Sequence, residues 1–119
     1  MFHHNKIQRV LLMASALTLS SVAVAQDCGE VPARPELVDG ASSTMDQMVA
    51  NSEAVKGYIA DADAYLDCRE AYIVTEEFQA LEEGDQQAYR AANKTVLDSR
   101  NSIGEDFNAE VSAYKEANP

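Results

Sequence analysis

The chain has 119 residues and is strongly acidic, with 20 Asp and Glu against 9 Lys and Arg and a formal net charge of −11. This charge disfavours nucleic acid and anionic membranes as partners. The length suits one small domain whose core is limited by its ratio of surface to volume.

The first 25 residues are typical of a secretory signal peptide. Lys6 and Arg9 precede an apolar run over residues 10–19, and residues 23–25 (Ala-Val-Ala) form a small-x-small cleavage pattern. The run is shorter than the roughly 20 apolar residues of a membrane span, and the residues before Cys28 do not suit a lipid anchor. We therefore expect cleavage near Ala25 and a periplasmic or secreted protein with no stable membrane anchor.

Removal of the signal would leave 7 basic and 20 acidic residues, a formal charge of 7 − 20 = −13. It would also remove both histidines, His3 and His4, so that no imidazole remains for acid–base catalysis, for a Ser-His-Asp triad or for binding a metal. The remaining lysines have no catalytic motif around them. We expect no enzymatic activity and no cofactor.

The two cysteines, Cys28 and Cys68, predict one intramolecular disulfide, because an exported chain meets an oxidising compartment. A loop of about 40 residues gives a stabilisation of roughly 3 to 4 kcal/mol in the chain-entropy model. An intermolecular bridge and free thiols are the alternatives. A zinc site is disfavoured because only two sulfur ligands exist.

A long helix is predicted over residues 42–83. Ser42, Ser43 and Thr44 are good caps, with Asp46 as a capping-box partner of Ser43 and Gln47 as one of Thr44. Gly84 suits a left-handed end of the helix, and Asp85 is expected to cap the next one. Its apolar and aromatic residues follow heptad spacing, which predicts a coiled-coil-like seam. Two heptad positions form the seam: Met45, Ser52, Ile59, Leu66, Ile73 and Ala80 at one, and Met48, Val55 and Ala62 at the other. Beside the seam runs a third line that adds aromatic width to its second half: Thr44, Asn51, Tyr58, Tyr65 and Tyr72.

A second helix over residues 85–117 repeats spacings of three and four and should pack antiparallel on the first. A kink or break is expected near Gly104, where Ser102 and Glu105 suit a new capping box. Arg100 lies near the apolar line and should extend its charge to water. The apolar positions are Tyr89, Ala92, Val96, Leu97, Ile103, Phe107, Val111 and Tyr114.

Residues 26–41 are predicted to form an extended strap, because Pro32 and Pro35 disfavour helix before them. From Asp39 to Cys28 the strap reaches about 36 Å, close to the rise of about 39 Å along a helix from Ser42 to Cys68. It should therefore run almost taut and antiparallel to the first helix. The fold class is all-α: a long antiparallel helical hairpin with an N-terminal strap tied to its first helix by one disulfide.

A stripe of small residues on the Cys68 side of the first helix would accommodate this strap. Gly is a poor helix former, so Gly57 in this stripe indicates that another backbone approaches closely there. The alternative is that the stripe is simply exposed, because Ala is a common residue at exposed helix positions. The stripe consists of Ala50, Ala54, Gly57, Ala60, Ala64, Cys68 and Ala71.

Several short segments resemble a family of short, exported, mostly proteobacterial helical proteins of unknown function. They are Asp39-Gly40 with the following Ser/Thr-rich cap, Val55-Lys56-x-Tyr58, Tyr65-Leu66-x-Cys68, residues 107–111 (Phe-Asn-Ala-Glu-Val) and Tyr114-Lys115. The resemblance covers nearly all of the mature chain and implies a periplasmic setting. It implies no catalytic or binding residue.

Acidic residues form two groups, residues 61–70 and the corner at residues 76–85. An EF-hand is excluded at Asp61, because its sixth and twelfth positions are Leu66 and Tyr72 rather than Gly and Glu. The corner predicts at most weak binding of a divalent cation, with a solvated acidic face as the alternative.

The aromatic ladder of the first helix is the candidate interaction face. It comprises Tyr58, Tyr65, Tyr72 and Phe78. Aromatic residues at this spacing are typical of a core or an interface and less typical of a ligand-stacking surface.

Three functions fit these features. The chain is predicted to be a structural or protein-interaction module that binds itself or a partner protein. A small periplasmic chaperone or stress binder of exposed apolar segments and a weak divalent-cation binder are the alternatives.

Overall fold

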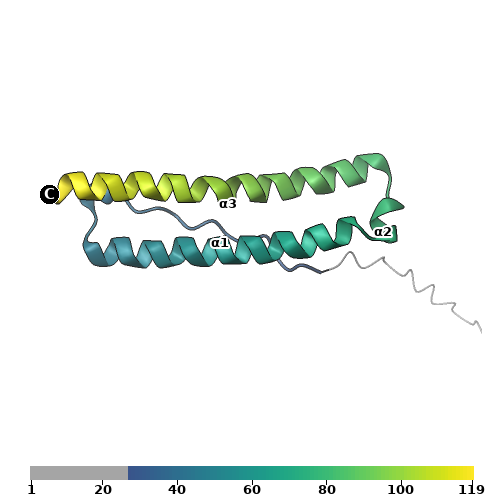
Figure 1. Cartoon of the computed structure of the whole chain (residues 1–119), viewed down its shortest axis with the longest axis horizontal. Helices are drawn as coiled ribbons and strands as arrows, with labels where there is room; N and C mark the ends of the chain where they lie inside the picture. Colours follow the sequence, from purple (N-terminus) through teal and green to yellow (C-terminus); the bar gives the residue numbers. More distant parts are fainter. Residues whose placement is uncertain (1–26) are drawn as a thin grey trace, which may run out of the picture.

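A computed structural model describes residues 27–119 and shows that this part of the chain is all-α, as predicted (Figure 1). A 3-10 turn, η1 (Gly40–Ser42), precedes the long helix α1 (Met45–Ile73), the short helix α2 (Glu76–Gln79) and the long helix α3 (Glu83–Ala117). The predicted signal peptide lies outside the described residues. No helix within residues 27–119 is long and apolar enough to cross a membrane.

Of the two predicted capping boxes, the start of α1 uses the one formed by Thr44 and Gln47, whereas the Ser43 hydroxyl donates to the Asp39 carbonyl instead. The Thr44 hydroxyl accepts a hydrogen bond from the Gln47 backbone N–H (3.2 Å), and the Gln47 side chain accepts one from the Thr44 N–H (2.8 Å). Two N–H groups that the first turn leaves without helical partners are satisfied in this way. Asp39 caps the preceding η1 turn through the N–H of Ala41 (3.1 Å).

The first helix ends ten residues earlier than predicted, at Ile73 rather than at residue 83. The reason lies in the β-branched run Ile73-Val74-Thr75, whose side chains are restricted in a helix. Thr75 leaves the helix and caps α2 by accepting from the Phe78 N–H (3.2 Å). A local capping bond thus outweighs the heptad pattern that continues through Ala80.

Gln79 and Gln86 satisfy backbone carbonyls at this corner. The Gln79 amide donates to the Ile73 carbonyl (2.8 Å), and the Gln86 amide donates to that of Leu81 (3.1 Å). The prediction that Gly84 ends the first helix and Asp85 caps the second is wrong. Both residues lie in the first turn of α3, where acidic side chains favour the positive end of the helix dipole.

Helices α1 and α3 lie side by side and run in opposite directions, with the corner at α2 (Figure 1). The Tyr58 hydroxyl donates to the Ser99 hydroxyl (2.8 Å), and that of Tyr89 to the Arg69 carbonyl (3.3 Å), which sets the register of the two helices. The break predicted near Gly104 is absent, because α3 continues through that residue. The buried residues of the two helices are Met48, Asn51, Val55, Tyr58, Ala62, Tyr65, Tyr72, Ile73, Asn93, Val96 and Ile103.

A compact aromatic cluster closes the corner end of the helix pair. Tyr72, Phe78 and Tyr89 contact one another with ring centroids 5.3 to 5.5 Å apart, in edge-on or tilted arrangements that aromatic pairs favour. Phe78 has no exposed surface. Helix α2 thus places the Phe78 side chain over the corner end of the core.

The strap runs alongside the two long helices (Figure 1), and the predicted disulfide ties it to α1. Cys28 and Cys68 are joined with their Cα atoms 5.7 Å apart. At the other end, the Asn51 side chain accepts from the Val38 N–H (3.1 Å) and donates to the Glu36 carbonyl (2.9 Å). Burying Asn51 within α1 therefore anchors strap backbone.

Helix α3 also contacts the strap, through Arg34. Arg34 forms an ion pair with Asp106 (2.7 Å) and donates hydrogen bonds to the carbonyl of Ser99 and the hydroxyl of Ser102. The strap therefore contacts both helices rather than following the small-residue stripe of α1 alone. Gly57, the glycine of this stripe, has no atom within 4 Å of the position that a Cβ would occupy. No backbone therefore packs closely against it.

Candidate interaction face

The predicted interaction face is not on the surface. Tyr58, Tyr65, Tyr72 and Phe78 have exposed fractions of 8% or less. The heptad position of the three tyrosines points between α1 and α3, and α2 turns Phe78 inward. The aromatic ladder is therefore part of the core, one of the two environments, core or interface, that are typical of its spacing.

The two sides of the helix pair differ in what covers them. On one side the strap contacts Cys68 of α1 and Ser99, Ser102 and Asp106 of α3. The other side carries a mostly apolar line on each helix, and we call it the open face. Its lines are Met45, Ser52, Ile59, Leu66 and Ile73 on α1, and Arg90, Leu97, Gly104 and Val111 on α3.

Helix geometry explains why these lines lie on the same side. The residues of each line are seven apart, so they stack along one edge of the seam. Each line follows directly on the buried positions: Leu66 follows Tyr65, and Leu97 lies four residues after the buried Asn93. The open face is thus the margin of the core: Ile59 and Leu66 are partly buried against it, and Ile73 is buried at its corner end.

Two apolar grooves mark the ends of the open face. One, of about 400 Å³, lies near the corner and is lined by Leu66, Ile73 and Leu97 together with polar side chains. The other, of about 450 Å³, lies at the free end, between Met45 and Val49 of α1 and Val111 and other residues of α3. Leu97, Met45 and Val49 are 44%, 58% and 53% exposed, so large apolar side chains contact solvent in both grooves.

An ion pair crosses the open face between the two grooves. Arg100 of α3 donates to both carboxylate oxygens of Asp63 on α1, at 2.8 and 3.0 Å, a two-point geometry that fixes orientation as well as charge. The hydrogen bond from Arg100 lowers the pKa of Asp63. The positive charge of Arg100 acts in the same direction, and partial desolvation of the carboxylate opposes both. The same hydrogen bond raises the pKa of Arg100. Arg100 was predicted to extend its charge to water, and in the structure its guanidinium binds the Asp63 carboxylate.

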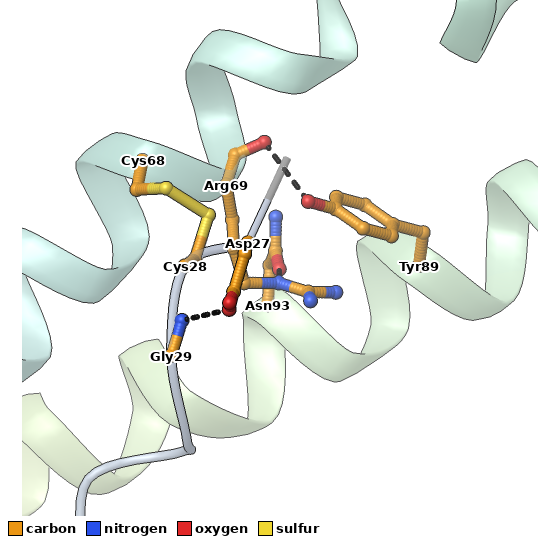
Figure 2. The surroundings of a disulfide bond; sticks show 7 residues. All are labelled: Asp27, Cys28, Gly29, Cys68, Arg69, Tyr89 and Asn93. Atoms are coloured by element: carbon orange, nitrogen blue, oxygen red, sulfur yellow. Dashed lines mark hydrogen bonds between the residues drawn. A yellow bond between two sulfur atoms is a disulfide. The ribbon is translucent and has the colours of Figure 1, made fainter. Parts of the chain in front are cut away.

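A polar layer interrupts the core near the disulfide, and Figure 2 shows its residues. Arg69 lies at a seam position, with its guanidinium 3.7 Å from the centre of the Tyr89 ring and its Nε donating to Asn93. Asn93 is 4% exposed and donates onward to Glu70 (3.2 Å). Desolvation raises the pKa of Tyr89, although the nearby Arg69 charge opposes this.

This layer connects α1 to α3 through hydrogen bonds. Within residues 27–119, every buried side-chain nitrogen and oxygen has a hydrogen-bond partner. In the same part of the chain, no three Cys, His or carboxylate side chains come together as a metal site would require. The acidic corner therefore presents no preformed cation site among the described residues.

Sequence reasoning recognised part of the open face and misplaced it. The line from Met45 to Ile73 is one of the two heptad positions predicted to form the seam, with the tyrosine line beside it, but three adjacent positions cannot all point at one partner helix. Met48, Val55 and Ala62 are buried together with the tyrosine line. The line from Met45 is left at the edge as a result.

Comparison of the chain with models of protein families, with curated proteins and with solved structures yields no match. The functional conclusion therefore depends on the residues and their arrangement.

Proposed function

We propose that this chain is an exported, non-enzymatic protein-interaction module, built as a strapped, coiled-coil-like helical hairpin. Its open face would bind a helix of a partner protein. The observation that carries the proposal is the pair of apolar grooves between α1 and α3, with Leu97, Met45 and Val49 half exposed.

The arrangement of the strap supports this assignment. Two packed helices have two long flanks, and the strap contacts one of them through Arg34 and Cys28. A helix laid on the other flank would complete a three-helix bundle and bury both apolar lines. Grooves between helices are a common mode of binding an amphipathic helix.

Crosslinking followed by reconstitution tests this proposal. A photoreactive amino acid at Leu97 should form a defined adduct with a partner protein in the cells that make the chain, whereas one at Ala91, on the outer side of α3, should not. The purified partner should then bind the oxidised protein and lose binding to Leu97→Glu but not to Ala91→Glu. Equal binding to both variants would show that the open face is not the docking surface.

A chaperone role is a second candidate that the same face supports. The free-end groove includes Met45 and Met48, and methionine adapts its shape to varied apolar partners. If this role is correct, the protein should slow the aggregation of an unrelated unfolded protein, and Leu97→Glu should weaken that effect. Inertness at stoichiometric excess would eliminate it.

A further inference from the structure

We infer that the Cys28–Cys68 disulfide is a redox switch: its reduction frees residues 28–33, which we call the outer strap, and leaves residues 34–40, the inner strap, bound to the helices. The inference does not depend on the docking function, because it concerns the strap side of the helix pair. It is carried by the different ways in which the two parts of the strap are held.

The inner strap is bound to both helices at three separate points. Each point is a hydrogen bond or an ion pair of 2.7 to 3.1 Å, and Leu37 packs against the core between them. None of these contacts involves a cysteine, so reduction leaves them in place. The points are Arg34 on Asp106, Asn51 on the Glu36 carbonyl and the Val38 N–H, and the Gly40 N–H on Glu110.

The outer strap has no such contacts. In the part of the chain that the structure describes, no hydrogen bond or ion pair joins residues 28–33 to a helix, and the Gly29 N–H donates only to the neighbouring Asp27 (2.8 Å) (Figure 2). Cys28 packs against the core, whereas Val31 is 60% exposed. The disulfide is therefore the bond that holds the outer strap to α1.

A groove of about 440 Å³ lies between the outer strap and α1. Val31 and Pro32 line it from the strap, and Ala64 and Tyr65 line it from α1. Since strap side chains do not fill this space, the outer strap can move away without leaving a cavity inside the core. Its departure would uncover the flank of α1 around Tyr65.

The disulfide is placed where a reductant can reach it. Cys28 and Cys68 are both half-buried, and exposed disulfides are the more readily reduced ones. We take the reductant to be a dithiol. One of its thiolates attacks a protein sulfur and forms a mixed disulfide, and its second sulfur then displaces the protein from that bond. The dithiol leaves as a disulfide, and its two electrons and two protons pass to Cys28 and Cys68, which become thiols.

The inner strap makes this reduction reversible, because it keeps the freed Cys28 close to Cys68. Cys28 is six residues from the first anchored side chain, Arg34, a distance of at most about 20 Å when the chain is extended. A short tether gives the two thiols a high effective concentration. An oxidant should therefore re-form the same bond within one molecule.

The test is nitrogen-15 relaxation of the labelled, purified protein before and after reduction with dithiothreitol. The order parameters of the Glu30 and Val31 amides should fall from about 0.85, the value of a rigid backbone, to below about 0.6. Those of Leu37 and Val38 should stay at the rigid value, since their rarer opening is detected only by hydrogen exchange. Glutathione disulfide, added after dithiothreitol is removed, should restore the rigid outer strap in a monomer.

Two variants assign these changes to the disulfide and to the inner strap. Cys28→Ser/Cys68→Ser should show the reduced pattern with or without dithiothreitol. Arg34→Ala removes the first anchor of the inner strap, so reduction should then make residues 34 and 35 mobile as well. Lys94→Ala is its matched control, because Lys94 pairs with Asp98 on the same helix, and it should leave the mobile segment ending at residue 33.

Three outcomes would overturn the inference. If Glu30 and Val31 stayed rigid after reduction, packing would hold the outer strap and the disulfide would be a crosslink only. If Leu37 and Val38 became mobile together with them, the strap would be released as one unit. If reoxidation gave disulfide-linked dimers, the inner strap would not keep Cys28 near Cys68.

Discussion

Gly40 lies against the backbone of Glu110, and this contact joins the start of the helical region to the end of α3. The Gly40 N–H donates to the Glu110 carboxylate (2.7 Å), and a Cβ on Gly40 would lie 1.8 Å from the Glu110 carbonyl oxygen. Only glycine fits at this distance.

Gly40→Ala should therefore destabilise the protein by about 1 to 3 kcal/mol, the range expected for overpacking. The matched control is Gly57→Ala, at an exposed position within α1 whose Cβ would meet nothing within 4 Å. It should stabilise by about 0.5 to 1 kcal/mol, because Ala is the better helix former. Urea denaturation of the two variants measures both changes in the free energy of unfolding. If Gly40→Ala changed this free energy no more unfavourably than Gly57→Ala, the close contact of Gly40 with Glu110 would not be formed.

Loss of the disulfide should release the strap without unfolding the helices. Cys68→Ser removes the crosslink that closes a loop of 40 residues and should lower the free energy of unfolding by about 2 to 4 kcal/mol. Hydrogen exchange at the Val38 amide, which donates to Asn51, should accelerate. Cys28→Ser and the double variant should match Cys68→Ser because all three lack the same bond, and an unchanged thermal melt would contradict the account of the strap.

Burial of the aromatic cluster predicts a large effect at the corner. Phe78→Ala should cost about 3 to 5 kcal/mol, since Phe78 has no exposed surface and contacts two other rings. Val74→Ala, four residues earlier and 82% exposed, should change stability by less than about 0.5 kcal/mol. If Phe78→Ala lowered the free energy of unfolding no more than Val74→Ala does, the aromatic cluster would not be part of the core.

The ion pair on the open face predicts a dependence on pH. The pKa of Asp63 is lowered from its ordinary value of 3.8 by Arg100. A lowered carboxyl pKa adds stability that is fully present above the ordinary value and disappears as the pH falls through the lower, folded-state value. Asp63→Asn should therefore melt below the wild-type protein at neutral pH, and the gap should close as the pH falls below 3.8 through the lower pKa of Asp63 in the folded protein.

Asp67→Asn is the control for this pH series, because Asp67 is exposed on the outer side of α1. A gap between wild type and Asp63→Asn that stayed constant into acid would mean that the Asp63 carboxylate is not stabilised by its partner.

Local chemistry determined what could be predicted from the sequence. The Thr44–Gln47 capping box and the Cys28–Cys68 bond follow from residue types at fixed spacings, and both are confirmed. The all-α class follows from apolar spacings of three and four. These features depend on neighbours in the chain or on a single possible pairing.

What could not be predicted depended on competition between interactions. The heptad pattern continued past Ile73, and only the burial of Phe78 and the cap at Thr75 show that a turn is favoured there. The place of Arg69 in the core depends on contacts with Tyr89 and Asn93 from the facing helix, which no spacing within α1 reveals. The open face could not be located before it was known which side the strap covers.

The most direct test of the proposed docking face is to map bound peptide by NMR. Amide shifts of the isotopically labelled, oxidised protein would be recorded with and without an amphipathic helical peptide of about 28 residues, long enough to span the rise of α1. The account predicts that the largest shifts cluster around Met45, Leu66, Leu97 and Val111, along both lines of the open face. Shifts confined to the strap side, around Arg34 and Ser102, or the absence of shifts at saturating peptide, would contradict it.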